Sequence, residues 1–283
     1  MDRVTEERAM KGLMIAALTI VVGSLIAIIG VVVWKGLPSL SIEMLTETPR
    51  GGYYTSTGGG GILNAIVGSL YLAFGSTLIA LVISVPAAFA LQDEYLGRTR
   101  YAGRLRLALD VLWGTPSIVY GAFGFIVMLY LGIRASLLGG IIVLTLLQIP
   151  IMIRAMEEVI RMVPREIKEA SAVLGATRWE TTTRVVVHQV APGIITAVLL
   201  AFGRGIGDAA SVLFTAGYTD SLPGSLFEPV ASLPLAVFFQ LGMPYPEVQA
   251  RAYTAALILL VIVLLLSLAS RALAKRFRKN ILR

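Results

Sequence analysis

The stretch MEEVIRMVPREIKEASAVLGATRWETTTRVVVHQ, residues 156–189, decides how this chain is organised. It is polar, yet it lies between two apolar segments, residues 135–153 and 190–216, each about as long as a membrane crossing requires. It contains Glu169-Ala170-Ser171 and then Gly175, and basic residues recur through this region: Arg154, Arg161, Arg165, Lys168, Arg178 and Arg184. A polar segment with structural signals of its own predicts a docking surface rather than a linker.

Local signals predict two short helices within this stretch. Pro164 interrupts the helix that leaves the preceding span, and a short helix should follow over residues 165–174, with Gly175 suited to its C-terminal cap. Thr177 and Glu180 have the spacing of a capping box that opens the next helix. We call residues 165–187 the knob. Its apolar Leu174 and Trp179 fit either a groove on a cytoplasmic protein or the inner membrane leaflet.

The composition identifies an all-helical integral membrane protein. Of 283 residues, 57% are hydrophobic and 14% are charged, and the mean hydropathy is +0.82. A spanning helix needs about 20 apolar residues. Six segments meet this requirement, and the first is expected to be retained in the membrane: residues 12–34, 62–91, 108–132, 135–153, 190–216 and 252–270.

The basic residues predict the orientation. With both termini in the cytoplasm, nearly every Lys and Arg flanks a span on the inner side, as the positive-inside rule requires. The exceptions are Lys35, Arg50, Arg134 and Arg251 outside, and Arg204 within a span. The net charge of +7 could suggest nucleic acid, but no aromatic platform is interleaved with these charges. Anionic lipid headgroups of a plasma membrane are the expected partner, with no nucleic acid.

Several chemistries are excluded or disfavoured. The chain has no cysteine, and its one histidine, His188, has no second His to make a metal site. Gly58-Gly59-Gly60-Gly61 lacks the Lys and Ser or Thr of a phosphate-cradling loop, and the glycines read as a turn. Any ATP that drives this protein must therefore be hydrolysed by a partner. Two longer loops, residues 35–61 and 217–251, are expected on the outer face.

Arg204 and Asp208 are charged residues in the fifth predicted span. Their spacing of four places them on one helix face, where they could pair, and Gly203 and Gly207 form a strip that admits a close neighbouring helix. A charge near the middle of a span costs about 2.5 to 3.5 kcal/mol on insertion scales. Two readings remain open: a structural ion pair that fixes helix register, or an arginine on an anion pathway.

Residues 114–121, Gly-Thr-Pro-Ser-Ile-Val-Tyr-Gly, form a second motif, in the third predicted span. Pro116 removes a helical hydrogen bond, while Ser117 and Tyr120 lie on one face that either satisfies the freed backbone or lines a pathway. Asn64 and Gln148 are expected to form hydrogen bonds between helices.

The loop at 156–189, the order of the spans, and the motifs at 114–121 and 204–216 together resemble the membrane subunits of bacterial phosphate ABC importers, of the PstA type. The resemblance runs from about Gly60 to the carboxyl end. Two positions depart from it: Asp208 replaces the usual Glu, and Ser211 replaces the usual Pro.

The resemblance implies a type I ABC importer permease fold (MetI-like). Residues 1–61 would hold the N-terminal tail, first span and external loop, residues 62–272 the permease core, and residues 273–283 a basic cytoplasmic tail. It implies a second permease subunit (PstC type), two copies of a cytoplasmic ATPase (PstB type) that bind ATP and Mg²⁺, and an external binding protein (PstS type). This chain would bind no cofactor and catalyse no reaction. The implied ATPase-coupling residues are Glu169, Ala170, Gly175, Thr177 and Trp179, and the pathway residues are Arg204, Asp208, Ser117 and Tyr120.

The sequence leaves three alternatives to a phosphate permease. Sulfate, molybdate or tungstate could replace phosphate within the same superfamily. Gly205-Ile206-Gly207-Asp208 matches the pattern of intramembrane aspartyl proteases, but the only other acid near a span interior, Asp110, is expected at a different depth. A secondary transporter or channel needs no cytoplasmic docking knob.

Overall fold

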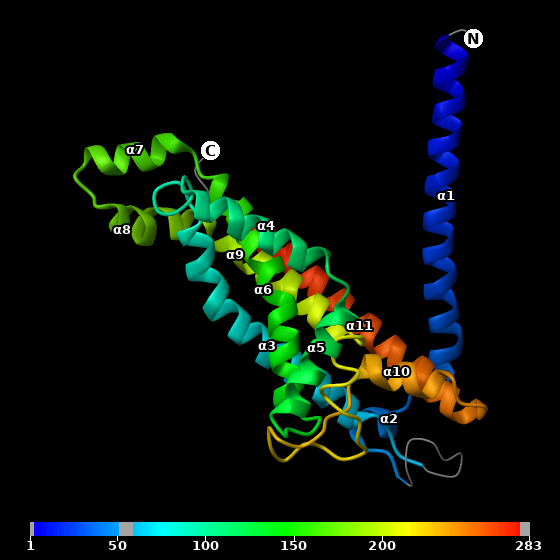
Figure 1. Cartoon of the computed structure of the whole chain (residues 1–283). Helices are drawn as coiled ribbons and strands as arrows, with labels where there is room; N and C mark the ends of the chain where they lie inside the picture. The colour runs from blue at the N-terminus through cyan, green and yellow to red at the C-terminus, as the bar shows by residue number, and fades with distance from the viewer. Residues whose placement is uncertain (1–2, 51–58, 278–283) are drawn as a thin grey trace.

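The computed structural model describes residues 3–50 and 59–277, and over these the chain is a helical bundle (Figure 1). The main helices, in chain order, are α1 (Arg3–Gly36), α2 (Ile42–Thr46), α3 (Leu63–Ala90), α4 (Arg100–Gly114), α5 (Ser117–Tyr130), α6 (Leu137–Arg161), α7 (Arg165–Val173), α8 (Arg178–Glu180), α9 (Val187–Gly207), α10 (Leu233–Leu241) and α11 (Pro246–Phe277). A short 3₁₀ turn η1 (Leu37–Ser39) follows α1, and a π-helical segment η2 (Thr181–Val186) joins α8 to α9.

The predicted spans correspond to these helices with one important difference. Five are single helices long and apolar enough to cross a membrane, but the third, expected at 108–132, is two helices, α4 and α5, bent by 98°. Pro116 disfavours the helical conformation in the residue before it, and Thr115 is accordingly extended (φ −72°, ψ 129°). Six spans are present if this bent pair is counted as one, and the interruption expected at Pro116 is a full break between two helices.

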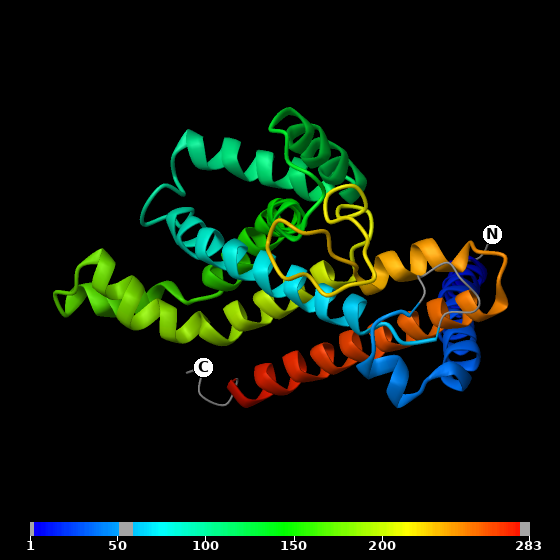
Figure 2. The same ribbon diagram turned by 90° about the horizontal axis from the view of Figure 1, so that it is seen from below.

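Helix α6 is the centre of the bundle. It runs between α3, α4 and α9, and Figure 2 shows these helices arranged around it. Polar contacts as well as apolar packing hold α3 against it: Gln148 accepts a hydrogen bond from Thr77 and donates one to Ser76, both at 3.0 Å. The predicted role of Gln148 between helices is thereby confirmed. Asn64 donates to the Thr219 carbonyl (2.6 Å), which fastens α3 to the loop before α10.

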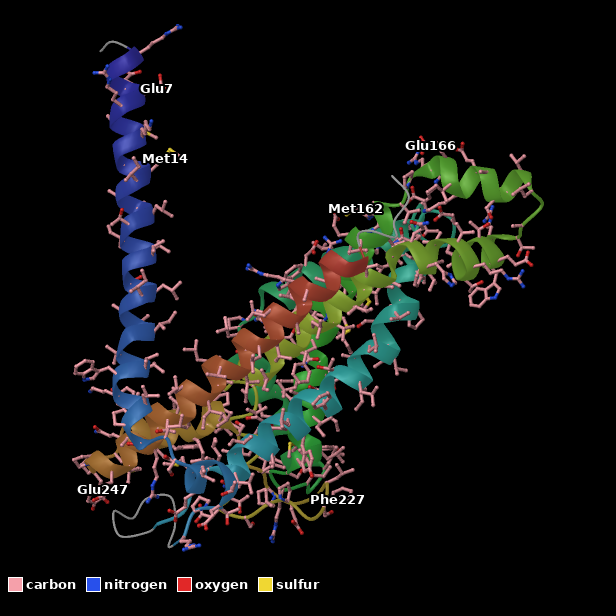
Figure 3. All side chains as sticks on the ribbon, turned by 180° about the vertical axis from the view of Figure 1, so that it is seen from behind. Glu7, Met14, Met162, Glu166, Phe227 and Glu247 are labelled. Carbon is pink, nitrogen blue, oxygen red and sulfur yellow. The ribbon has the colours of Figure 1, made fainter. Side chains whose placement is uncertain are left out.

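The two ends of the bundle differ. One carries α7 and α8, near Met162 and Glu166, and the other carries Phe227 and Glu247 with α2 and α10 (Figure 3). Helix α1 stands apart from the bundle and joins it at the second end, where Gly36 accepts a hydrogen bond from Thr254 (3.1 Å) and Lys35 lies over the Tyr253 ring. Residues 51–58 and 278–283 lie outside the described residues, and the domain boundaries at 61 and 272 stay predictions.

Candidate functional site

The knob has the local structure that its sequence predicts. Gly175 has a φ of +84°, which only glycine adopts without strain, and the amide of Ala176 donates to Ser171 at the end of α7 (3.2 Å). Thr177 accepts a hydrogen bond from the Glu180 amide (3.2 Å), and the Glu180 carboxylate accepts one from the Thr177 amide (3.0 Å). This reciprocal capping box confirms the predicted start of the second knob helix.

The outer face of the knob is exposed and partly apolar. Leu174 is 88% exposed and Trp179 is 69% exposed, and the predicted coupling residues Glu169, Ala170, Gly175 and Thr177 are exposed as well. Ser171 and Thr181 share a hydrogen bond (3.0 Å) that closes α7 onto η2. A pair of short helices joined by this hydrogen bond therefore presents apolar side chains at the end of the molecule, and its role in docking stays a prediction.

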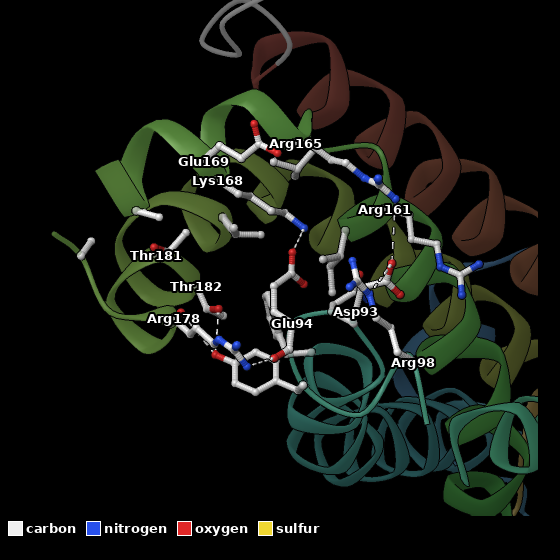
Figure 4. A pocket seen from close by; sticks show the side chains of 18 residues that line it. Asp93, Glu94, Arg98, Arg161, Arg165, Lys168, Glu169, Arg178, Thr181 and Thr182 are labelled. Atoms are coloured by element: carbon white, nitrogen blue, oxygen red, sulfur yellow. Dashed lines mark hydrogen bonds and ion pairs between the residues drawn. The ribbon is translucent and has the colours of Figure 1, made fainter. Parts of the chain in front are cut away.

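Beneath the knob lies a cavity of about 560 Å³, between α7, η2 and the turn at residues 91–99 (Figure 4). The turn is bound directly to the knob: Lys168 meets Glu94 at 2.8 Å, Arg178 donates to the Glu94 carbonyl (3.0 Å), and Tyr95 shares a hydrogen bond with Thr182 (2.9 Å). Burial raises the pKa of the Glu94 carboxyl, but the hydrogen bond and charge of Lys168 outweigh it, so the pKa lies below its usual value. Sequence reasoning missed these contacts because they join residues far apart in the chain.

A second cluster lies at the break between α4 and α5. Helix α5 begins at Ser117, and Tyr120 in its first turn donates a hydrogen bond to the Leu112 carbonyl at the end of α4 (2.8 Å). A side chain on Gly121 would meet the carbonyls of Ala210 and Ser211 at 2.7 and 2.8 Å, so only glycine allows this close approach. The two motifs at 114–121 and 204–216 therefore contact each other in the structure. The sequence alone did not predict this contact.

Helix α9 ends at Gly207, before the predicted limit of its span at 216, and this changes the relation of Arg204 to Asp208. Asp208 has extended backbone (φ −82°, ψ 121°), and its carboxylate accepts a hydrogen bond from the Ser211 amide (2.8 Å). Among the described residues no ion pair joins Arg204 to Asp208. The expectation that both lie on one helix face was wrong, because the helix stops between them. Of the two readings left open, the structural ion pair has no contact among the described residues to support it.

Arg204 lies at mid-height on an open face of the bundle. The next residue, Gly205, contacts the side-chain amide of Gln148, near the midpoint of α6. The Arg204 side chain is exposed. Apart from the adjacent residues and the backbone of α9 itself, no atom of the described chain lies within 4 Å of the position that a side chain on Gly203 or Gly207 would occupy. The close helix neighbour that this glycine strip would admit is therefore not found among the described residues.

Glu157 is a buried charge that sequence reasoning did not select. It lies in α6 with Arg154 three residues before it and Arg161 four residues after it, a spacing that could have indicated ion pairs on one helix face. The third contact, from Arg106 in α4, is long-range and carried no sequence signal.

Comparison with known proteins identifies the family. Residues 95–279 match the family described as binding-protein-dependent transport system inner membrane component. The chain belongs to this family. It is therefore a multi-pass inner-membrane transport subunit.

The relatives agree over most of the chain. A phosphate transport system permease protein PstA of Xylella fastidiosa is 34% identical over 247 residues, which cover 86% of this chain and 83% of the relative. A PstA of Haemophilus influenzae is 32% identical over 95% of this chain and 94% of its own length. A probable ABC transporter permease, YqgI of Bacillus subtilis, is 30% identical over 99% of each chain.

Solved structures agree on the fold. An inward-facing structure of the MetNI methionine ABC transporter has a TM-score of 0.62 at 16% identity, covering 76% of this chain and 95% of that one. A bacterial ABC transporter that imports the acidic polysaccharide alginate has a TM-score of 0.62 at 15% identity, covering 96% and 99%. The predicted MetI-like permease fold is thereby confirmed.

Proposed function

We propose that this chain is the permease subunit of an ATP-driven phosphate importer and forms half of its translocation pathway. Relatives named as phosphate permeases, at 34% and 32% identity over most of the chain, support the substrate. The fold shared with ABC importer permeases supports the mode of transport. The proposal assigns no covalent chemistry to this subunit.

The position of Arg204 carries the proposal. An exposed arginine at the mid-height of a membrane bundle, with no ion pair among the described residues, cannot face lipid without a cost of roughly 2.5 to 3.5 kcal/mol or more. An aqueous pathway at the contact with a second subunit removes that cost. The exposed face around Gly203, Arg204 and Gly207 is where we place this contact.

The surroundings of Arg204 suit a phosphate anion in transit. Helix α5 begins at Ser117, so the positive end of its dipole lies in its first turn. Gly121, just after that turn, packs against the carbonyls of Ala210 and Ser211, a few residues beyond Arg204. A guanidinium fork matches the geometry of phosphate oxygens. Asp208 lies just beyond the helix end and lowers the net positive charge, so the site attracts an anion without retaining it. Weak binding is what release into the cell requires.

The full importer would contain three further kinds of subunit. A second, related permease of the PstC type would face Arg204, two copies of a PstB-type ATPase would bind the knobs from the cytoplasm, and a PstS-type binding protein would deliver phosphate from outside. Both termini would then be cytoplasmic. ATP binding would close the ATPase pair and drive the knob, and with it the spans, from an inward-open to an outward-open arrangement.

Transport by the reconstituted four-component complex tests this function. Proteoliposomes that contain ATP on the side where the ATPase subunits bind should accumulate labelled phosphate. Excess unlabelled phosphate should reduce uptake of the label. Sulfate, molybdate and tungstate should compete weakly, because the binding protein and the Arg204 site would be matched to phosphate. Preferred uptake of one of these anions would reassign the substrate while leaving the permease role intact.

A further inference from the structure

We propose that Glu157 is a positioning residue through which movement of the knob reaches α4 and the Arg204 site, so that it sets how much transport each ATP yields. The inference rests on the proposed function and adds to it a physical route between the ATPase-facing end and the pathway. The route consists of three sets of contacts, which meet at this carboxylate.

The first set holds Glu157 itself. Its side chain is almost fully buried, and three guanidinium groups surround it: Arg106 at 2.6 Å, Arg161 at 2.7 Å and Arg154 at 3.0 Å. Hydrogen bonds between ionised partners are about twice as strong as neutral ones. Arg154 and Arg161 lie on α6 with Glu157, whereas Arg106 comes from α4, so the carboxylate fastens α4 to the end of α6 from which the knob extends.

The second set joins this cluster to the knob. Arg106 also donates to the carbonyls of Leu91 (2.8 Å) and Gly97 (3.3 Å), and so fixes both ends of the turn at 91–99. The middle of that turn is the part bound to the knob, through the pairing of Glu94 with Lys168 at 2.8 Å. Displacement of the knob should therefore move this turn, which Arg106 connects to Glu157.

The third set joins the cluster to the pathway. Arg154 binds Asp110 on α4 at 2.8 Å, so α4 is attached to α6 at two points along its length. Helix α4 ends at the break before Pro116, and Tyr120 beyond the break donates to Leu112 at the end of α4 (2.8 Å). Because the 98° bend is bridged by this hydrogen bond, rotation of α4 moves the start of α5, where Gly121 packs against Ala210 and Ser211 in the segment that follows Arg204 and Asp208.

The charges explain why Glu157 is the critical member. Without it, Arg106, Arg154 and Arg161 would face one another with Asp110 as the remaining acid of the cluster, and like charges at short range repel. Each arginine is partly exposed and can turn toward water. The bundle should therefore fold without the carboxylate, while α4 loses its attachment to α6.

The test compares Glu157→Gln with Glu158→Gln in the reconstituted importer. Glu158 is the next residue on α6, is exposed, and has no ion pair among the described residues, so it controls for loss of a negative charge. We expect Glu157→Gln to keep ATP hydrolysis that the binding protein stimulates, while phosphate transported per ATP falls about tenfold or more, a typical size for coupling between sites. Glu158→Gln should match the unaltered protein.

A structural readout separates positioning from mere loss of activity. Because the chain has no cysteine, two cysteines can be introduced for spin labelling: Gly103→Cys on α4, where a side chain meets open space, and Leu268→Cys on α11, which is exposed. In a complex with cysteine-free partners, the two labels report the distance from α4 to α11. ATP should change this distance in the unaltered chain and in Glu158→Gln, but not in Glu157→Gln. An unchanged transport ratio, or an ATP-driven distance change that persists in Glu157→Gln, would overturn the proposal.

Asp110→Asn keeps the proposal testable if Glu157→Gln fails to assemble. It removes only the partly exposed Arg154 contact with α4, and we expect a smaller fall in transport per ATP together with a smaller distance change. Normal values of both in Asp110→Asn would count against the route. The distance change requires only ATP binding. It therefore tests the positioning role of Glu157 even if the importer carries an anion other than phosphate.

Discussion

The side-chain amide of Gln148, near the midpoint of α6, lies directly against the α-carbon of Gly205 in the last turn of α9. The same amide group binds Ser76 and Thr77 on α3, so one polar side chain holds three helices at a common height. This contact fixes where Arg204 lies, because Arg204 is the adjacent residue. The depth of Arg204 in the bundle therefore follows from the packing of Gly205 against Gln148 and not from a contact of the arginine side chain.

Replacement of Gly205 by alanine should destabilise the bundle. The added methyl group would clash with the Gln148 amide and disturb its bonds to α3, and overpacking of this kind costs about 1 to 3 kcal/mol. Thermal unfolding of the isolated chain in detergent measures the loss. Gly203→Ala is the matched control, because its methyl group meets open space and alanine favours a helix. Equal stability of the two variants would show that the Gln148 contact does not hold α9 in place.

The knob should weaken when its capping box is broken. Thr177→Ala removes the hydroxyl that accepts from the Glu180 amide, and loss of such a cap costs about 1 kcal/mol. Hydrogen exchange of residues 178–184 should accelerate. Thr183→Ala is the control, since that hydroxyl donates to a carbonyl within the helix and caps nothing. Unchanged protection in Thr177→Ala would show that this cap does not stabilise the knob.

Gly175→Leu should detach or uncouple the ATPase. The left-handed backbone at this position strains any larger residue, and the apolar face beside Leu174 would be displaced. Co-purification of the ATPase and phosphate uptake should both fall. Gly132→Leu makes the same kind of substitution at a φ of +69°, in a turn at the opposite end with open space around it, and should leave ATPase binding intact. Normal uptake and co-purification in Gly175→Leu would refute a docking role for the knob.

The contact between Glu94 and Lys168 should depend on pH in one direction. Because the pKa of Glu94 in the folded chain lies below its ordinary value of 4.5, its stabilisation is complete at neutral pH and is lost as the pH falls through that lowered pKa. The pair is partly exposed, so the effect should stay below about 1 kcal/mol. Glu94→Gln should lower the unfolding temperature at pH 7.5, and the difference should shrink as the pH falls below 4.5. A difference that stays constant as the pH falls would assign the effect to packing.

The sequence predicted local structure well where the responsible residues are neighbours. The break at Pro164, the glycine at 175 and the capping box of Thr177 with Glu180 depend on contacts within a few residues, and the structure has each of them. The apolar segments predicted the spanning helices for the same reason, since hydropathy is a property of the segment itself.

The features that sequence reasoning missed depend on distant residues. A proline indicates a bend but not its angle, and the close approach of Gly121 to residues 210 and 211, which accompanies the 98° bend, joins positions far apart in the chain. An i, i+4 spacing predicts an ion pair only if the helix continues, and α9 stops at Gly207. The Glu157 cluster requires α4 to fold back along α6, which no local pattern encodes.

Phosphate uptake by the Arg204→Gln variant tests the central claim most directly. The account predicts that the complex assembles, that the binding protein still stimulates ATP hydrolysis, and that uptake is lost. Uptake should also remain absent in Arg204→Gln with Asp208→Asn, because Asp208 binds its own turn rather than Arg204. Normal uptake in the single variant, or its recovery in the double variant, would contradict the claim that Arg204 handles the anion.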